Sequence, residues 1–334
     1  MRFQKDDPAR ENKEELSGSD ADISRHMKEL DTLKEGAGAV AKLIACGHSA
    51  IEPLRKFLLA GEPRVLYHTR RWAVEALAGL GARDILLEYL KQEREIPDLA
   101  VRLGEEAVKS AAAQKLIKWP SEEVIQVLIG IAQERSLPGA LEALGELKRP
   151  EAIPFLIEAL EDDVCRPVAE DALRKIGRPA ESALIQATIT SYPNRESEKP
   201  SSLLRRRCAV GLLEELGVSK NKWALLRPLL QDVDDKILTA VFKIAVSVAG
   251  VKDRETAFRR LIEILQNADW YVKGENENAL IDEFEAIKKT MEEEIHRRRK
   301  RLKGDLDSVL ICLLDVKRRT DQEKLDFPGG HFDR

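Results

Sequence analysis

Apolar and polar residues repeat in a helical pattern along the middle of the chain. A basic residue, a run of small and apolar residues and a final leucine recur at 70–77, 166–173 and 206–213. A glycine closes each copy four residues after that leucine (Gly81, Gly177 and Gly217). Recurrence of one helical unit is typical of a solenoid, in which neighbouring units bury a continuous core. We therefore predict an all-α chain of stacked helical hairpins.

The spacing of apolar residues predicts alternating first and second helices. Helical spacing begins at Ile23, and a second short helix is expected at 37–45. Six complete pairs and the first helix of a seventh pair follow. They are 50–59 with 66–80, 84–91 with 99–117, 121–133 with 137–147, 151–160 with 164–176, 181–190 with 202–216, 222–230 with 235–248, and 255–265. Asp163 and Asp234 precede two of the second helices, where an aspartate N-cap accepts hydrogen bonds from free backbone N–H groups.

Two stretches depart from the regular spacing. The unit at 98–118 is helical but matches the other copies poorly, so its register stays open. The interval between Leu173 and Leu213 lengthens to 40 residues, and it contains the polar segment 192–201 with two prolines. This composition predicts a surface loop, so the array is expected to continue on both sides of it.

The two ends of the chain differ from its middle. Residues 1–20 are polar and charged, which predicts a disordered tail before a solenoid at 21–270. Apolar residues between Leu280 and Ile295 recur on one side of a long charged helix. Because terminal units of a solenoid must cover an exposed core, we predict a long-helix hairpin cap at 271–326 and a short tail at 327–334.

Composition and charge narrow the class of protein. The formal net charge of −4 gives no global attraction to nucleic acid or to anionic membranes. The sequence has no apolar run long enough to span a membrane, and its start lacks the apolar core of a secretory signal. Four cysteines lie far apart inside helical patterns, which is typical of reduced thiols in a cytoplasmic protein.

The clearest form of the repeat is carried by residues 166–177 together with Ala152-Ile153-Pro154-Phe155-Leu156. Residues 69–81 carry a second form, with Trp72 where a small residue is usual. These segments resemble HEAT repeats, most closely the short subtype associated with phycobilisome lyases (PBS-lyase HEAT-like repeats). The resemblance covers residues 50–270 and implies a right-handed α-solenoid of the armadillo type with about seven hairpins and a helical cap. HEAT repeats occur in scaffolds, lyase subunits and nucleic-acid enzymes, so the resemblance leaves the function open.

Three arginines occupy one position in three copies of the repeat, namely Arg70, Arg166 and Arg206. A row of guanidinium groups on one wall would bind a carboxylate-rich peptide or a phosphate backbone. Alternatively, each arginine pairs with an aspartate in the neighbouring turn and stabilises the stack. The resemblance favours the second interpretation, and the first is kept as a hypothesis.

A basic cluster follows the 192–201 loop. Arg205, Arg206 and Arg207 are consecutive, and Arg195, Lys199, Lys220 and Lys222 are nearby in the sequence. The cluster would attract anions, or it would form a solvated helix start, which the overall acidity favours. A second basic run, at 297–303, follows three glutamates at helical ion-pairing distance, and we interpret it as helix stabilisation.

Aromatic side chains are a third candidate for binding. Trp72 is close in sequence to Arg70, Tyr67 and His68. Tryptophans stack on nucleic-acid bases when they line one groove. However, the four tryptophans occupy different places in their units, so packing is the expected role of most of them (Trp72, Trp119, Trp223 and Trp270).

No motif for catalysis, a cofactor or a metal is found in the sequence. Cys46-Gly47-His48 has two potential ligands but no second pair. The leading hypothesis is therefore a non-enzymatic scaffold that binds a protein or peptide on an extended helical-repeat surface. The alternatives are a phycobilin lyase or isomerase subunit, which the resemblance suggests, and a nucleic-acid binder, which rests on Trp72, Arg195 and Arg205 to Arg207.

Overall fold

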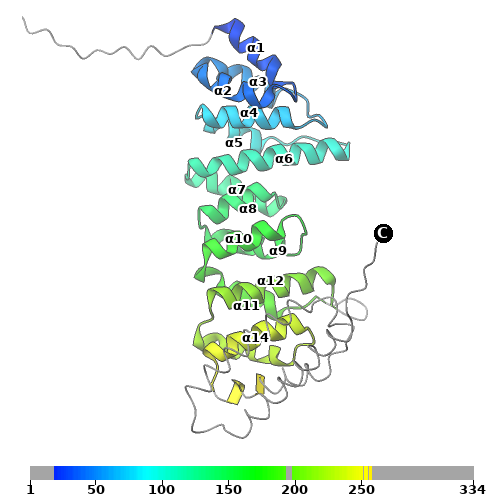
Figure 1. The fold of residues 1–334 in the computed structure, drawn as a ribbon, viewed down its shortest axis with the longest axis vertical. Helices are drawn as coiled ribbons and strands as arrows, with labels where there is room; N and C mark the ends of the chain where they lie inside the picture. Colours follow the sequence, from blue (N-terminus) through cyan, green and yellow to red (C-terminus); the bar gives the residue numbers. More distant parts are fainter. Residues whose placement is uncertain (1–18, 193–197, 251, 255, 258–334) are drawn as a thin grey trace, which may run out of the picture. The chain divides into compact units, whose positions relative to one another are not determined.

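The computed structural model describes residues 19–192, 198–250, 252–254 and 256–257, and within these ranges every regular element is a helix. The chain divides into two compact units, with the boundary between Ala180 and Glu181. Most of the described helices are labelled in Figure 1. The described helices confirm the predicted all-α solenoid, because consecutive hairpins pack side by side within each unit.

The described part of the first unit consists of five helical hairpins in chain order. Their helices are α1 (Asp20–Leu30) with α2 (Gly36–Ala45), α3 (Ile51–Leu59) with α4 (His68–Gly79), α5 (Arg83–Lys91) with α6 (Leu99–Lys115), α7 (Glu122–Glu134) with α8 (Pro138–Glu146), and α9 (Ile153–Ala159) with α10 (Arg166–Ile176). Short 3₁₀ turns lie next to several of them, at Gly47–Ala50, Leu116–Lys118 and Pro150–Ala152, and the turn Arg178–Ala180 follows α10. The unit at 98–118, whose register the sequence left open, forms α6 and takes its regular place between α4 and α8.

The second helices of the hairpins form a continuous row in this unit. Each of α2, α4, α6 and α8 packs against the next second helix, whereas neighbouring first helices touch much less. Fully buried leucines lie along the seam, among them Leu43, Leu77 and Leu144. Glycine permits the close approach of α8 to α10, because a Cβ on Gly145 would lie 2.5 Å from the Cβ of Ala172. Burial of apolar side chains along this row therefore stabilises the unit.

The helix ends follow local chemistry. The predicted N-cap Asp234 is confirmed, because its carboxylate accepts from the backbone N–H of Ile237 at 3.0 Å. The predicted N-cap Asp163 is wrong. Asp162 accepts from the N–H groups of Val164 and Cys165 in that turn, and the carboxylate of Asp163 instead pairs with Arg166. The N-cap of α10 is Cys165, which makes no side-chain capping bond, so Asp162 stabilises the turn that precedes the helix and does not cap it.

The second unit begins with a hairpin of α11 (Glu181–Ile189) and α12 (Pro200–Leu216). The predicted helix at 222–230 is instead divided into a 3₁₀ turn (Lys220–Lys222), α13 (Trp223–Leu226) and a second 3₁₀ turn (Arg227–Gln231). Pro228 lies in the second 3₁₀ turn, and a proline inside a helix removes a backbone donor and disfavours a continued α-helix. α14 (Asp235–Val248) completes the pair and packs on α12.

Several predicted features lie outside the described residues. They are most of the tail at 1–20, the helix at 255–265 apart from two residues, Arg195, Trp270, the cap at 271–326, the basic run at 297–303 and the tail at 327–334. The N-terminal boundary is described, since Ser19 caps α1 by accepting from the N–H of Asp22.

Candidate binding surfaces

Arg70 of α4 lies inside the first unit and is 2% exposed. Its guanidinium donates to the carbonyls of Phe57, Leu58 and Gly61 at the end of α3, at 3.3, 2.8 and 2.9 Å. Two further bonds of 3.1 Å reach the carboxylate of Glu105 on α6. These five bonds match the five N–H donors of an arginine.

The carboxylate of Glu105 is held from a second side. The Tyr89 hydroxyl donates to it at 2.8 Å, and the Arg70 guanidinium lies 5.7 Å from the centre of the Tyr89 ring. Burial, followed by the negative charge of Glu105, raises the pKa of Tyr89 far above its usual value, so the phenol stays protonated and donates. Arg70, Glu105 and Tyr89 thus form a closed buried group that joins the second hairpin to the third.

Arg166 and Arg206 make the equivalent contact in their own hairpins. Arg166 donates to the carbonyl of Leu160 at the end of α9 at 3.0 Å, and Arg206 donates to that of Thr188 near the end of α11 at 2.8 Å. The carbonyls at a helix C-terminus carry partial negative charge, which favours a cation there. The three arginines therefore share a role that the sequence did not reveal: each binds the C-terminal end of the first helix of its hairpin.

The carboxylate partners of these arginines differ from copy to copy. Arg166 pairs with the neighbouring Asp163 at 2.5 Å. Arg206 pairs with Glu198 at 2.7 Å and also with Asp232. Arg70 pairs with a glutamate of the following hairpin instead of an aspartate in a turn. All three guanidinium groups are therefore engaged by partners within their own unit.

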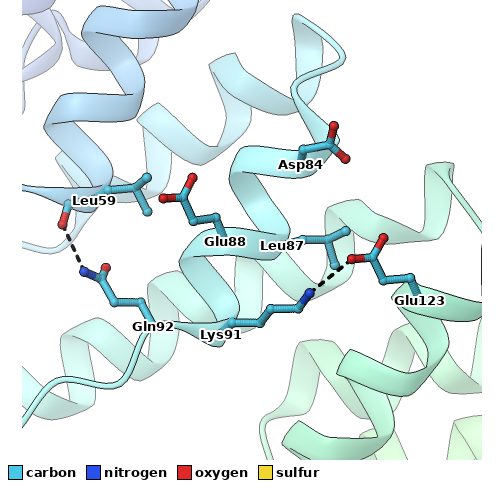
Figure 2. A pocket seen from close by; sticks show the side chains of 7 residues that line it. All are labelled: Leu59, Asp84, Leu87, Glu88, Lys91, Gln92 and Glu123. Atoms are coloured by element: carbon cyan, nitrogen blue, oxygen red, sulfur yellow. Dashed lines mark hydrogen bonds and ion pairs between the residues drawn. The ribbon is translucent and has the colours of Figure 1, made fainter.

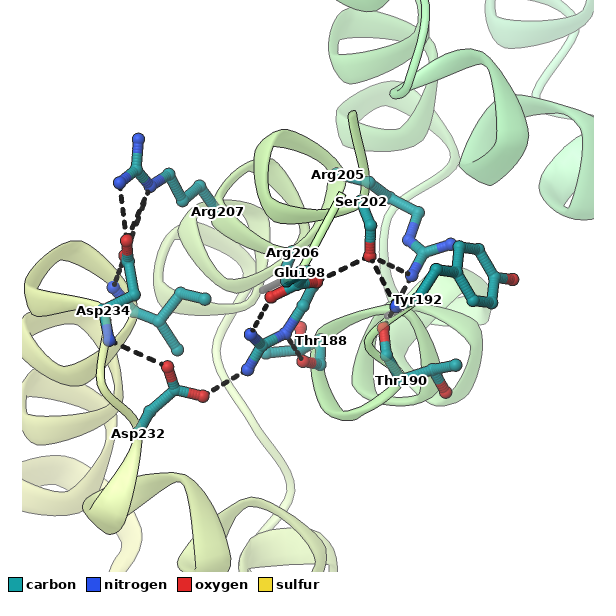
Figure 3. A network of polar contacts seen from close by, with 11 residues as sticks. Thr188, Thr190, Tyr192, Glu198, Ser202, Arg205, Arg206, Arg207, Asp232 and Asp234 are labelled. Carbon is teal, nitrogen blue, oxygen red and sulfur yellow. Dashed lines mark hydrogen bonds and ion pairs between the residues drawn. The ribbon is translucent and has the colours of Figure 1, made fainter. Parts of the chain in front are cut away.

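The basic cluster of the second unit is a network of internal contacts (Figure 3). Arg205 is 4% exposed, donates to the carbonyl of Thr190 at 2.6 Å and lies over the ring of Tyr192, 4.2 Å from its centre. Arg207 pairs with Asp234, the N-cap of α14, at 2.5 Å. The network connects α12 to the segment after α11 and to the turn before α14.

Hydrogen bonds within this network stabilise the charged forms of Asp234 and Arg206. Burial alone would raise the pKa of Asp234, but the hydrogen bond from Arg207 and the N–H of Ile237 outweigh it and lower the pKa. Burial likewise opposes the charge of Arg206, and its bonds to Glu198 and Asp232 raise the pKa above the usual value. Lys222, also assigned to the basic cluster, donates to Glu181 at 2.9 Å.

Tyr67, His68 and Trp72 come together at the start of α4. The Tyr67 and His68 rings are stacked with centres 4.4 Å apart, and His68 and Trp72 are tilted with centres 6.4 Å apart. The Trp72 ring covers Gly36, where a Cβ would lie 1.9 Å from the ring carbon Cζ3. Trp72 therefore packs α4 against the start of α2, which explains how a large residue occupies a position usual for a small one.

A groove lies on the first helices of the first unit, between α3, α5 and α7 (Figure 2). It has a volume of about 510 Å³ and is lined by Leu59, Leu87 and several charged side chains. Glu88 pairs with Arg55 at 2.9 Å, and Glu123 pairs with Lys91 at 3.1 Å and with Arg83 at 2.7 Å. The hydrogen bond from Lys91 is the main cause of a lowered pKa of Glu123. Asp84 pairs with Arg83 at 3.6 Å, so all three acidic groups that line the groove are paired with a cation.

A second hollow, which the sequence did not point to, lies beside the first half of α6. Its volume is about 410 Å³, and four cations contribute to its lining: Arg94, Arg102, Lys109 and Arg135. Arg102, Glu106 and Lys109 are spaced by four and three residues, which puts them on one helical face. This spacing is visible in the sequence, but the hollow depends on how α6 and α8 are aligned.

The large exposed hydrophobic side chains are concentrated in the first unit. Five of the nine among the described residues belong to the α1–α2 turn, the α3–α4 loop and the start of α6: Leu33, Val65, Leu66, Leu99 and Leu103. The ion pair of Arg64 with Asp31 at 3.2 Å joins the loop to the turn. On its other side the loop meets α6, because a Cβ on Gly104 would lie 3.1 Å from the Cβ of Tyr67. We call these five residues the apolar edge.

A family model of HEAT repeats matches residues 96–177. The match includes α6, the unit that resembled the other copies least, and it supports a place in the HEAT-repeat family. It does not identify the phycobilisome-lyase subtype. No curated protein matches the chain.

The described residues contain no group of three or more histidine, cysteine, aspartate or glutamate side chains arranged to hold a metal ion. No helix within the described ranges is both long enough and apolar enough to cross a bilayer.

Proposed function

We propose that this protein is a non-enzymatic scaffold that binds a protein or peptide partner on the surface of its stacked hairpins. HEAT repeats commonly serve in protein interactions. The observation that carries the proposal is the apolar edge, where three consecutive hairpins expose large hydrophobic side chains on a turn, a loop and a helix start that contact one another. A contiguous exposed apolar patch on a folded protein typically marks an interaction site.

The candidate site residues of the sequence divide between two roles under this proposal. Arg70, Arg166, Arg205, Arg206 and Arg207 stabilise the surface from within, because each guanidinium is already bound by carbonyls or carboxylates. Tyr67, His68 and Trp72 follow Leu66 of the apolar edge, and we expect them to contact the partner.

The nucleic-acid alternative loses its main support for the same reason. The proposed anion-binding arginines of α12 are internally engaged, so a phosphate backbone would have to displace existing partners. The alternative of a phycobilin lyase or isomerase subunit predicts a bilin-dependent colour change on mixing with a phycobiliprotein, and it is tested by that measurement.

Affinity capture of the full chain with mass spectrometry tests the proposal. Wild-type protein should retain a stoichiometric partner from the native cell, and Leu66→Glu and Leu103→Glu should each lose it, because a charge in the apolar edge opposes burial. Val164→Glu is the matched control, since Val164 is 73% exposed but belongs to the α9–α10 turn. Absence of any reproducible partner, or equal loss with the control, would contradict the proposal.

A further inference from the structure

The first half of α6 is left uncovered by its neighbour α8. α6 has 17 residues and α8 has nine. The backbone N–H of Gly139, at the start of α8, donates to the Ser110 hydroxyl at 2.7 Å, and Gln114 bonds to Glu142 further along at 2.8 Å. These two contacts fix the alignment, so residues 99–109 of α6 extend past the beginning of α8 (Figure 1).

The cationic hollow lies beside this overhanging part of α6, and its other lining residues come from the α5–α6 loop and the end of α7. Lys109 is 8% exposed, and among the described residues the one acceptor bonded to its ammonium is the carbonyl of Gln92 at 2.6 Å. Arg102 projects from the same face of α6, and Arg135 ends α7 on the other side. Arg94 reaches in from the α5–α6 loop, where it donates to the carbonyls of Leu59 and Gly61. An ammonium has three donors, so Lys109 retains capacity for another acceptor.

These four cations differ from their neighbours in the same unit. Arg55, Arg83 and Lys91 are each paired with a glutamate. Within the described part of the chain, by contrast, no carboxylate forms an ion pair with Arg94, Arg102, Lys109 or Arg135. Glu105 also borders the hollow, but Arg70 neutralises it.

The charge on Lys109 is poorly compensated. Burial is the main cause of its lowered pKa, and the positive charges of Arg135 and Arg94 add to it, while the negative charges of Glu105 and Glu93 oppose it. A bound anion would relieve both effects, because it would supply the missing counter-charge in a partly desolvated site.

We propose that this hollow, the Lys109 pocket, binds a side-chain carboxylate of an acidic peptide segment whose apolar residues cover Leu99 and Leu103. The proposal rests on the proposed scaffold function and assigns the partner's chemistry. Leu99 and Leu103 lie one turn apart on α6 and are 58% and 56% exposed, directly beside Arg102. Glu95 and Glu106 also border the pocket and repel a continuous polyanion, which favours a peptide with separated acids over a nucleic-acid backbone.

Selection from a random 16-residue peptide library displayed on phage tests this pocket. The bait is the full chain, either wild type or Arg102→Glu/Arg135→Glu, whose two side chains are exposed. Lys56→Glu/Lys118→Glu is the control with the same change of net charge on exposed lysines outside the pocket. Wild type and control should select peptides in which aspartate or glutamate stands next to leucine-like residues.

Quantitative binding of one selected peptide, made synthetically with a fluorescent label, completes the test. Arg102→Glu/Arg135→Glu should weaken its binding at least tenfold, and so should replacement of its acid by glutamine. The two changes combined should weaken binding little further than either alone, since they remove one interaction. Lys109→Met provides a second, neutral variant, with its fold checked by circular dichroism.

The outcomes separate this inference from the scaffold proposal. Peptides that bind wild type and Arg102→Glu/Arg135→Glu equally would overturn the pocket while leaving the scaffold intact. Failure of the full chain to select any peptide would count against both. Selection of basic peptides, or binding of labelled single- or double-stranded DNA or RNA that is abolished by the same variants, would overturn the assignment to an acidic peptide.

Discussion

At the scale of single residues, an arginine joins the two helices in three of the described hairpins, and two of these arginines, Arg70 and Arg206, are buried. Arg70, Arg166 and Arg206 each bind the carbonyls that end the first helix of their hairpin, and Arg70 and Arg206 add carboxylates from elsewhere in their unit. A buried cation of this kind is stable only when its partners remain present. The sequence identified the shared position, but the 35-residue separation of Arg70 and Glu105 hid the pairing.

Replacement of Arg70 by methionine should therefore be strongly destabilising. It leaves the Glu105 carboxylate buried without a cation, and the loss of one partner of a buried pair costs about 3–5 kcal/mol of unfolding free energy. Arg71→Met is the matched control, because Arg71 is exposed and its pair with Glu75 is 3.8 Å long, so its expected cost is below about 1 kcal/mol. Urea unfolding followed by circular dichroism measures both.

A double variant separates pairing from packing at the same site. Arg70→Met/Glu105→Met removes both charges, and it should recover part of the stability lost in Arg70→Met alone, since the unpaired carboxylate is gone. Equal stability of the single and double variants would show that the pairing with Glu105 is not the source of the loss.

At the scale of elements, the alignment of second helices creates both the stack and the Lys109 pocket. α8 approaches α6 so closely that a Cβ on Gly139 would lie 1.9 Å from the carbonyl oxygen of Ser110. Because that oxygen belongs to the backbone of a helix, it cannot move away as the end of a flexible side chain could. The glycine thus fixes where α8 begins along α6, and hence how much of α6 extends past it.

Gly139→Ala should destabilise the first unit by about 1–3 kcal/mol, because the new methyl group forces the two helices apart. Gly130→Ala in α7 is the control, since a Cβ there meets nothing within 4 Å. Alanine favours a helix over glycine by up to about 1 kcal/mol, so the control should be neutral or stabilising. Thermal unfolding of the two variants measures the difference, and equal behaviour would mean that the α6–α8 contact tolerates the methyl group.

Helix pairing was predictable from the sequence, whereas the pocket was not. The apolar period placed α3 to α12 close to their observed positions, because each second helix buries one regular face. Pro228 disfavours a continuous helix at 222–230, but a proline is also tolerated in the first turn of a helix, so the sequence alone did not show where the helix divides. The Lys109 pocket arises from a difference in length between α6 and α8 combined with the Ser110–Gly139 contact, and the weak match of the 98–118 unit hid that alignment.

At the scale of the whole molecule, the chain has two compact units with the boundary after Ala180. Each hairpin of a solenoid is stabilised mainly by its nearest neighbours, so a substitution in one unit acts on that unit first. Gly139 and the α6–α8 contact belong to the first unit, and Arg206 with its partners Glu198 and Asp232 belongs to the second. A destabilising substitution in one unit should therefore lower the stability of that unit and leave the stability of the other nearly unchanged.

Urea unfolding observed by one tryptophan in each unit makes this measurable. Trp119 reports on the first unit, and Trp223, which is 6% exposed and donates to Asp253 at 2.8 Å, reports on the second. In proteins that keep only Trp119 or only Trp223 of the four tryptophans, Gly139→Ala should lower the unfolding midpoint seen by Trp119, and Arg206→Met should lower that seen by Trp223. Each variant should leave the other midpoint nearly unchanged. If either substitution shifts both midpoints equally, the two units unfold as one cooperative body, and the nearest-neighbour account of this solenoid fails.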